Sequence, residues 1–318
     1  MINYCTYFDK NYIHRGLALY FSLTKTNQAF TLWVLCFDNT TYNALKLLEL
    51  PNIKLISESE FENGDDKLIS VKTTRTRVEY YWTCTASLPL YIFKRNANLE
   101  LLIYLDADIY FYSSSNSIIE ELGKDSILIV PHDYSKEYEK HYEAGVYNVG
   151  VMAFKHDNNS LACLEWWRER CIEWCYAKYE NGQIGDQAYL NDWPNRFNNV
   201  KVCKNEGISA APWNIAKYRI KLDINSQILV SRKPLICFHF HALKFSNSFF
   251  AFAGTDKINI KTSELTLIYK PYIKDLLLAR NMLFENNYKI QFVYSGIPWR
   301  YLIGRIVKLK PIRHFLRY

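Results

Sequence analysis

The 318-residue sequence lacks the features that mark exported, membrane-spanning and zinc-binding chains. No run reaches about 18 consecutive apolar residues, and no basic segment precedes an apolar one at the N-terminus, so neither a membrane span nor an export signal is predicted. None of the eight cysteines stands in a C-x-x-C pair, which favours buried free thiols in a reducing cytoplasm over a zinc site. Internal repeats and low-complexity linkers are also missing. Hydrophobic residues at 49% and charged residues at 22% indicate a globular chain with a sizeable core.

Acidic residues are missing beyond Glu285, where seven lysines and arginines follow. The remainder of the chain holds 32 basic and 32 acidic residues, so the net charge of +7 belongs to the tail. This balance, and the lack of a Lys/Arg-rich groove signature, disfavour a nucleic-acid partner. Residues 294–318 mix six of the cations with aromatic and aliphatic side chains. That mixture predicts docking on an anionic membrane surface, and it is equally compatible with a basic terminal helix packed on the domain.

Apolar runs and amphipathic stretches alternate along the first half of the chain. This alternation indicates a parallel, doubly wound α/β sheet flanked by helices. We expect one main domain over 1–260 and a helical extension with a basic aromatic tail over 261–318. The predicted strands are 2–8, 31–37, 53–56, 101–105, 127–130, 147–154, 200–203 and 235–239; the predicted helices are 13–24, 42–50, 78–93, 161–179, 185–193 and 263–283; a polar loop is predicted over 58–67.

Two carboxylates end the apolar run from Leu101 to Leu105. In extended backbone Asp106 and Asp108 project to the same face, where their charges would repel each other. A divalent cation between them removes that repulsion, and Mg²⁺ and Mn²⁺ prefer such oxygen ligands and are often shared with a diphosphate. The pattern predicts a metal-dependent site for a nucleoside diphosphate, although most isolated Asp-x-Asp pairs are solvated loop ends.

A second group of polar residues follows the predicted strand 235–239. His239 and His241 share a face in extended backbone, and Lys244 follows at the strand end. Two imidazoles and a lysine could complete a metal site and neutralise phosphate. A pair of hydrogen-bonded core histidines is the other interpretation.

Two further features suggest contacts with a sugar. Asp186 and Gln187 place a carboxylate beside an amide, which suits a clamp on sugar hydroxyls, and an N-cap at Asp186 explains the same pattern. Gly150 lies inside a predicted strand, where glycine indicates close approach of a ligand or of backbone.

Six short segments occur in a recognisable order. They are D-K-N-Y at 9–12, Y-L-D-A-D-I at 104–109, Y-N-V-G-V at 147–151, D-Q-A-Y-L-N at 186–191, P-W-N at 212–214 and H-F-H-A at 239–242. In this order they resemble the glycosyltransferases of the GT-A fold. The similarity is greatest to family eight, which includes glycogenin and the bacterial lipopolysaccharide galactosyl- and glucosyltransferases, and it spans roughly residues 2–245.

The resemblance implies a role for each segment. Asp106 and Asp108, with His239 or His241, would hold Mn²⁺ or Mg²⁺. Asp186 and Gln187 would be the catalytic residues beside the anomeric carbon, and the segment at 212–214 would lie on the acceptor side. The residues implied to contact the nucleotide-sugar donor are Thr6, Asp9, Asn11, Tyr12, Asp106, Asn148, Gly150 and Lys244.

The sequence also departs from the family pattern. Ala242 stands where the family has a glycine, and Lys244-Phe245 replaces K-P-W with a spacing one residue shorter. The arginine that usually precedes the acidic motif has no clear counterpart, and Arg75 or Arg77 are its candidates. These departures suggest a neighbouring family.

The implied activity is metal-dependent transfer of a sugar from a UDP-sugar to a glycan or lipid-linked acceptor in surface polysaccharide biosynthesis. The resemblance implies retention of the anomeric configuration, whereas Asp186 acting as an in-line general base would give inversion. The implied location is the cytoplasm, peripherally at the inner face of the membrane. Two rivals remain: a haloacid-dehalogenase-like phosphatase, which also uses Asp-x-Asp, and a catalytically inactive sugar- or nucleotide-binding relative.

Overall fold

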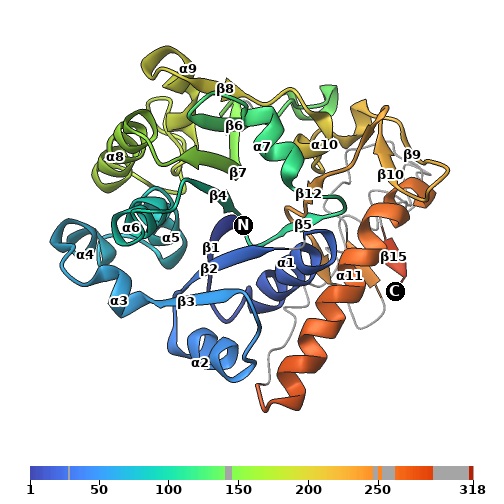
Figure 1. Ribbon diagram of the computed structural model, residues 1–318, viewed down its shortest axis with the longest axis horizontal. Helices are drawn as coiled ribbons and strands as arrows, with labels where there is room; N and C mark the ends of the chain where they lie inside the picture. Colours follow the sequence, from blue (N-terminus) through green and yellow to red (C-terminus); the bar gives the residue numbers. More distant parts are fainter. Residues whose placement is uncertain (28, 140–144, 246–249, 253–261, 289–314, 318) are drawn as a thin grey trace, which may run out of the picture.

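A seven-stranded sheet forms the centre of the computed structural model, which describes residues 1–27, 29–139, 145–245, 250–252, 262–288 and 315–317 (Figure 1). Its strand order is β3-β2-β1-β4-β7-β6-β8, and β7 alone in this sheet runs against its neighbours. The predicted mostly parallel sheet is therefore confirmed. The strands are β1 (Ile2–Phe8), β2 (Phe30–Cys36), β3 (Ile53–Ser57), β4 (Leu101–Leu105), β6 (Ile127–Pro131), β7 (Tyr147–Lys155) and β8 (Val200–Val202).

Helices cover both faces of this sheet, as the buried side chains of β1 show. Tyr4 packs into a core shared with helices α1, α2, α7 and α11, while its neighbour Cys5 packs into a core shared with α3, α4, α5, α6 and α8. Figure 1 shows α5, α6 and α8 gathered on one side and α1 and α11 on the other. The helices are α1 (Ile13–Thr26), α2 (Asn39–Leu47), α3 (Glu58–Glu62), α4 (Asp66–Lys72), α5 (Arg77–Cys84), α6 (Ser87–Arg95), α7 (Asn116–Leu122), α8 (Asn158–Glu173), α9 (Trp193–Arg196), α10 (Glu206–Ser209) and α11 (Thr262–Glu285).

The predicted polar loop over 58–67 is wrong, because this stretch contributes to two helices. The Ser57 hydroxyl accepts the N–H of Glu60 at the start of α3, and the Asp65 carboxylate accepts the N–H of Leu68 at the start of α4. Such caps satisfy otherwise unpaired N–H groups and stabilise short helices. Because charged residues dominate this stretch, the sequence pattern did not indicate where either helix begins.

The helix predicted over 42–50 is α2, which begins and ends three residues earlier, and three other predicted helices are divided, shortened or replaced. Residues 78–93 form two helices, α5 and α6, with a break at Thr85 and Ala86. The helix over 161–179 is α8, which ends at Glu173 because Trp174 adopts extended backbone. The stretch 185–193 holds a 3-10 helix, η2 (Ala188–Asp192), followed by α9. Asp186 caps neither of them, so the N-cap interpretation is excluded.

Three small sheets lie beside the main one. β5 (Ile109–Phe111) pairs antiparallel with β12 (Cys237–His239), so the predicted strand 235–239 does not join the main sheet. This pairing brings a distant part of the chain to the turn that carries Asp106 and Asp108. The other small sheets contain β9 (Ile220–Leu222), β10 (Ile228–Val230) and β11 (Lys233–Pro234), and β13 (Lys244–Phe245), β14 (Phe250–Phe252) and β15 (Phe315–Arg317).

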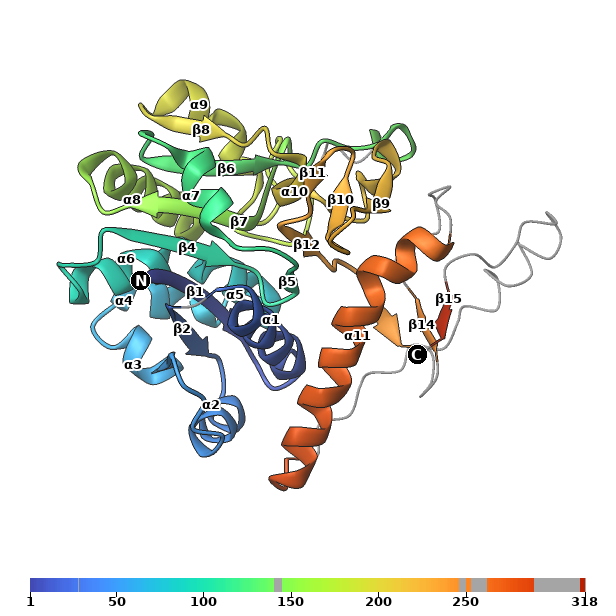
Figure 2. The same ribbon diagram turned by 45° about the vertical axis from the view of Figure 1, so that its right-hand side comes forward.

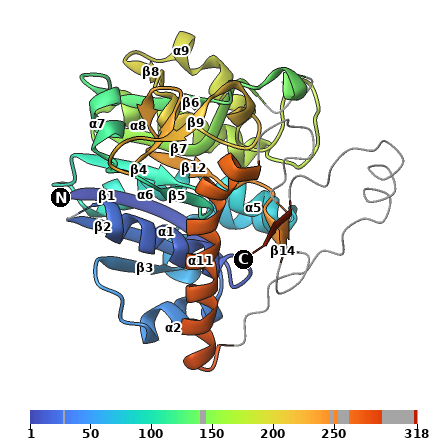
Figure 3. The same ribbon diagram turned by 90° about the vertical axis from the view of Figure 1, so that its right-hand side faces the viewer.

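The C-terminal helix α11 confirms the helix predicted over 263–283. It lies against α1 (Figure 3). Its buried Asp275 accepts a hydrogen bond from Tyr110 (2.7 Å) and pairs with Lys25. The predicted membrane-docking tail over 294–318 lies outside the described residues, apart from the backbone of 315–317, and so does the predicted domain boundary at 260. Among the described helices, none is long and apolar enough to cross a bilayer. All eight cysteines are buried and free, as predicted.

Candidate functional site

The two aspartates lie in a tight turn between β4 and β5. The N–H of Asp106 donates to the Gly150 carbonyl (2.9 Å), and the N–H of Ile109 donates to the Asp106 carbonyl (3.1 Å). The expectation of extended backbone from Asp106 to Asp108 is therefore wrong. The turn, and not strand alternation, brings the two carboxylates together.

His239 completes a cluster with the two aspartates. It lies opposite Ile109 in the β5–β12 pair, which places its Nε2 3.1 Å from Asp108 Oδ1 and 3.7 Å from Asp106 Oδ2. One oxygen of each aspartate and one nitrogen of His239 all lie within 4.8 Å of one another. His241 is not part of this group; it is exposed, and its ring centre lies 6.0 Å from that of His239.

Hydrogen bonds to Asn148 determine which nitrogen of His239 faces the aspartates. The N–H of Gly150 donates to Asn148 Oδ1 (2.8 Å), which identifies this atom as the amide oxygen. His239 Nδ1 lies 3.2 Å from the same oxygen and must donate its proton to it. Nε2 then faces two carboxylates, an arrangement that requires either a proton on Nε2 or a cation between the three groups. The donor set therefore fits a divalent cation held by two oxygens and one imidazole nitrogen.

Arg15 on α1 also contacts this cluster. Its guanidinium lies 3.4 Å from Asp108 Oδ2 and donates to the Leu243 carbonyl (2.8 Å). Burial alone would raise the pKa of the Asp108 carboxyl, but His239 and Arg15 outweigh burial and hold that pKa below its usual range. Burial lowers the pKa of His239, but the two aspartates outweigh burial and raise it. Arg15 thus ties α1, the acidic turn and the chain beyond His239 together.

The amides of Asn148 and Gln187 extend the site on the side away from Asp108. Asn148 Nδ2 donates to Gln187 Oε1 (3.1 Å) and lies 3.4 Å from His132 Nε2. Both amide side chains are half-buried, so part of each is accessible from outside the protein. His132 is buried and contacts the Gly145 carbonyl through Nδ1 (2.9 Å). Burial lowers the pKa of His132 to about 3, so this ring is neutral.

Asp186 lies deeper than Gln187 and is only 6% exposed. Its Oδ2 accepts the hydroxyl of Thr85 (2.7 Å), which lies 2.9 Å from the hydroxyl of Tyr7. Burial raises the pKa of the Asp186 carboxyl to about 7, and the Asp106 charge acts in the same direction against the hydrogen bond from Thr85. Near neutral pH the protonated and ionised forms of this carboxyl are therefore both populated.

We expect Asp186→Asn to change how stability depends on pH. The folded pKa lies above the ordinary value of 3.8, so the wild-type protein loses stability as pH rises from about 4 through 7. A shift of about three units corresponds to roughly 4 kcal/mol at most, and the asparagine variant lacks this loss. Urea unfolding in EDTA at pH 5 and pH 8 measures the difference. Thr85→Val removes the hydrogen bond that favours the charged carboxylate, so this variant should lose more unfolding free energy between pH 5 and pH 8 than the wild type does. A difference in unfolding free energy between Asp186→Asn and wild type that is the same at both pH values would contradict the raised pKa of Asp186.

The D-K-N-Y segment forms the turn between β1 and α1. Asp9 is buried, and its carboxylate accepts the N–H of Asn11 (2.9 Å) and the hydroxyl of Tyr81 (3.2 Å). Tyr12 is 46% exposed and lies beneath the Arg15 guanidinium, 4.7 Å from its ring centre. Thr6, within β1, is fully buried, and its hydroxyl has no hydrogen-bond partner among the described residues. Tyr12 contacts Arg15, and Arg15 contacts Asp108, so these two residues connect this turn to the cluster of two aspartates and His239.

The two candidate arginines and Lys244 occupy different surroundings. Arg75 donates to the Ile172 carbonyl at the end of α8 (2.5 Å), which holds it away from the cluster. Arg77 donates to the Phe37 carbonyl (2.7 Å) and lies 3.8 Å from Asp9, so it belongs to the D-K-N-Y side of the site. Lys244 is exposed and directly follows the Leu243 carbonyl that Arg15 holds.

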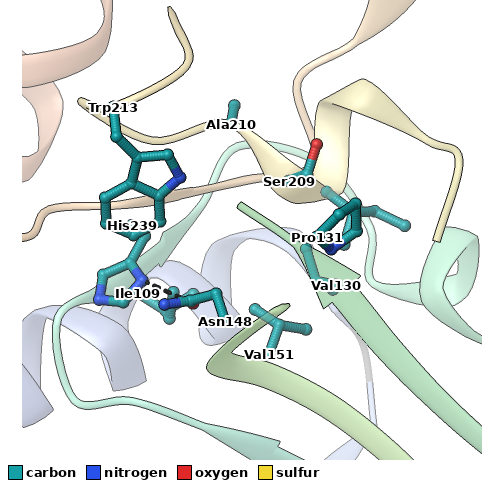
Figure 4. A pocket seen from close by; sticks show the side chains of 10 residues that line it. Ile109, Val130, Pro131, Asn148, Val151, Ser209, Ala210, Trp213 and His239 are labelled. Carbon is teal, nitrogen blue, oxygen red and sulfur yellow. Dashed lines mark hydrogen bonds between the residues drawn. The ribbon is translucent and has the colours of Figure 1, made fainter. Parts of the chain in front are cut away.

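A narrow pocket opens beside His239 and Asn148 (Figure 4). Trp213 forms one wall, edge-on to the rings of His132 and His239 at centroid distances of 5.1 and 5.2 Å. Its indole N–H is buried without a hydrogen-bond partner among the described residues. The neighbouring Asn214 is fully buried and donates to two backbone carbonyls, which makes its role structural. The remaining lining residues are Ile109, Val130, Pro131, Val151, Ile208, Ser209 and Ala210.

Three residues of the site were not predicted from the sequence. Arg15 stands three residues beyond Tyr12 on the first turn of α1, and this helical spacing is a usable signal, since it places both side chains on one face. His132 and Thr85 carry no comparable signal. Each reaches the site through a contact between segments far apart in the chain.

The fold is the GT-A fold. The chain superposes on galactosyltransferase LgtC, solved with donor and acceptor sugar analogues, with a TM-score of 0.54 and 17% identity, covering 76% of this chain and 87% of LgtC. It superposes on the bifunctional glycosyltransferase WbbM with a TM-score of 0.55 and 13% identity, covering 91% of this chain and 52% of WbbM. At these identities the likeness concerns the fold.

Sequence relatives then place the chain in a family. It is 32% identical over 244 residues to the uncharacterized protein YfnF of Bacillus subtilis (strain 168), covering 74% of this chain and 80% of YfnF, and it belongs to the same family. The uncharacterized protein YfnD of the same organism is 27% identical over 282 residues, covering 86% and 88%. No protein-family model matches the chain.

Proposed function

We propose that this protein is a metal-dependent glycosyltransferase that moves a sugar from a nucleoside-diphosphate sugar, with UDP as the expected carrier, to a glycan or lipid-linked acceptor. One observation supports it above the others. Asp106, Asp108 and His239 converge within 4.8 Å at the end of a central strand in a GT-A fold. Ligands of open α/β sheets bind at the carboxyl ends of such strands.

Mn²⁺ or Mg²⁺ would be held by Asp106, Asp108 and His239. When bound, the cation supplies positive charge that offsets the charge building on the departing diphosphate. His241 lies outside the cluster but close to it, so it is assigned to the phosphate side with Lys244. Asn148 holds His239 through its Nδ1–H and fixes the ring for this role.

The sugar would lie against Asn148, Gln187 and Asp186. The two amides are joined by a hydrogen bond, which orients each of them. The Asp186 carboxyl lies deeper in the protein than Gln187 and would accept a hydrogen bond from a sugar hydroxyl. LgtC, whose fold this chain shares, has also been solved as an active-site variant with glutamine replaced by glutamate. This supports Gln187 as a catalytic residue. Gly150 lies beneath Asn148 and leaves room for it.

The nucleoside would lie against the D-K-N-Y turn. Asp9 is fixed by Asn11 and Tyr81, and Tyr81 stacks on Phe37 at a centroid distance of 4.1 Å. Exposed Tyr12 offers a ring face to the donor, and Thr6 lies in the strand beneath the turn.

The acceptor would approach from the Trp213 side, where the pocket lies. We propose retention of the anomeric configuration, with a leaving phosphate oxygen taking the acceptor's proton. Proton NMR of the first-formed product distinguishes the two outcomes, since inversion would point to Asp186 as a general base.

The Arg15 contacts give a prediction about stability. In EDTA, Arg15→Gln should lower the unfolding free energy by about 1–3 kcal/mol, because the buried Asp108 carboxylate and the Leu243 carbonyl each lose the guanidinium as a partner. Saturating Mn²⁺ should shrink this deficit, because the cation then neutralises Asp108. Arg15→Lys keeps the positive charge but cannot donate to Asp108 and to the Leu243 carbonyl from two nitrogens at once. Its unfolding free energy should therefore lie between those of the wild type and Arg15→Gln. An equal deficit with and without metal would separate Arg15 from the metal site.

A screen of UDP-, GDP- and TDP-sugars for metal-dependent donor hydrolysis tests the proposed activity. The proposal predicts hydrolysis of one donor class that stops in EDTA and returns with Mn²⁺. A phosphatase would instead release phosphate from simple phosphomonoesters, although four strands precede the Asp-x-Asp turn and the fold is GT-A. Binding without any turnover would identify an inactive relative.

We also propose where in the cell the reaction takes place and which pathway it serves. Transfer to a lipid-linked acceptor in surface polysaccharide biosynthesis would take place in the cytoplasm, at the inner face of the membrane. Cell fractionation followed by detection of the protein in the membrane and soluble fractions tests this location.

A further inference from the structure

Charge is unevenly distributed within the body of the protein. Residues 1–199 contain 19 basic and 26 acidic residues, whereas residues 200–245 contain eight basic and two acidic residues, a net charge of +6. The balanced charge of the body therefore conceals two regions of opposite sign. The interpretation that basic character belongs to the tail alone is incomplete.

Part of this positive charge lies on the small sheet β9–β11. Arg219, Lys221, Arg232 and Lys233 are exposed, and none of them forms an ion pair with a described residue. Figure 2 shows this sheet at one end of the molecule, far from α2. The strand register places Lys221 and Lys233 on opposite faces of this short sheet, so the four cations surround the hairpin. Positive charge on both faces suits an anionic partner that meets the hairpin end-on.

The loop between β9 and β10 carries exposed aliphatic side chains. Ile224 is 99% exposed and Leu222 is 46% exposed. Asp223 is the only acidic residue in this hairpin, and its carboxylate accepts the N–H groups of Asn225 and Gln227, each at 2.8 Å. These bonds fix the loop and hold Ile224 outward. Moving the exposed isoleucine side chain from water into an apolar layer is favourable in free energy, because apolar surface is removed from water.

We propose that the β9–β10 hairpin docks on an anionic lipid bilayer. Ile224 and Leu222 would enter the boundary between headgroups and acyl chains, while the four cations face lipid phosphates. A hydrated acidic polymer would satisfy the cations but would leave Ile224 in water, so a lipid surface fits both observations. The inference extends the proposed membrane location, but its observations use neither the metal cluster nor the donor, so vesicle binding can be tested separately from transfer.

The hairpin lies next to the acceptor side of the site. The chain reaches it directly from Trp213, and Tyr218 at its base donates to Asp133 (2.7 Å), beside His132. Docking would therefore bring the Trp213 pocket near the membrane surface, where a lipid-linked acceptor is presented.

Co-sedimentation of the full chain with vesicles tests the proposal. Vesicles of phosphatidylglycerol and phosphatidylcholine should bind the wild-type protein, and pure phosphatidylcholine should not. Ile224→Ser should weaken binding roughly tenfold, through loss of aliphatic burial. Lys221→Glu with Lys233→Glu should weaken it by more than about 20-fold, and added salt should weaken the wild type similarly.

Matched controls lie on α2. Leu47→Ser and Lys46→Glu remove an exposed aliphatic and an exposed cation far from the hairpin and should leave binding unchanged. Donor hydrolysis and melting temperature should be the same in all variants, which separates docking from activity and folding. Hairpin variants that bind vesicles as the wild type does would overturn the proposal. Binding to soluble polyglutamate as tight as to vesicles, with no effect of Ile224→Ser, would also overturn it.

Discussion

Replacing Asp108 with alanine is expected to reduce metal-dependent turnover by about 10³-fold or more. The carboxylate lies 3.1 Å from His239 Nε2 and 3.4 Å from the Arg15 guanidinium. Its loss removes one of the three groups proposed to hold the cation and leaves the Arg15 guanidinium without its ion-pair partner. A cation that stabilises the leaving diphosphate contributes several kcal/mol, and about 4 kcal/mol corresponds to a factor near 10³. Initial rates of donor hydrolysis against Mn²⁺ concentration measure the effect.

Asp133→Ala is a suitable control for Asp108→Ala. Asp133 is an exposed aspartate that pairs with Lys217 near the site but outside the cluster. It should keep the wild-type metal dependence. Normal transfer with an unchanged metal requirement in Asp108→Ala would refute the proposed metal role of the acidic turn.

Gly150→Ala is expected to cause the second large loss. A Cβ at this position would lie 2.6 Å from Asn148 Oδ1 and 2.6 Å from His239 Nδ1, closer than real Cβ contacts allow. The new methyl group must push both side chains aside and break the hydrogen bond that orients the imidazole. A displacement near 1 Å costs about 10²-fold in rate, and overpacking costs about 1–3 kcal/mol of stability. We expect weaker Mn²⁺ binding and about 10²-fold lower turnover.

Val149→Ala tests whether the loss in Gly150→Ala comes from the strand or from the site. Val149 is the adjacent residue on the opposite face of β7 and is buried against α-helical neighbours. It should lower stability without weakening Mn²⁺ binding. Wild-type metal affinity in a folded Gly150→Ala protein would contradict the described contact.

The sheet was predictable because its strands are buried apolar runs, and buried runs separated by amphipathic stretches indicate an α/β sheet on local information alone. The Asp106–Asp108 pair was predictable for a similar reason, since the motif is contained in one short segment. Its backbone was not, because hydrogen bonds from the turn to Gly150 decide the shape there. The glycine in β7 predicted close approach of a ligand or of backbone, but the groups that lie closest to it are the side chains of Asn148 and His239.

The remainder of the site depends on contacts between distant segments. Which histidine faces the aspartates follows from the β5–β12 register, which pairs His239 with Ile109. The Arg15 contacts join α1 to the acidic turn and to Leu243, at sequence separations of 93 and 228. Alternation and helical periodicity carry no information about such pairings. Short capped helices such as α3 and α4 were missed because charged residues dominate their sequence.

The most direct test of the account is calorimetric titration of UDP into the protein, with Mn²⁺ and with EDTA. The account predicts binding that requires the metal and that disappears in a folded His239→Ala variant. Binding of equal strength in EDTA, or an unaltered metal requirement in His239→Ala, would contradict it.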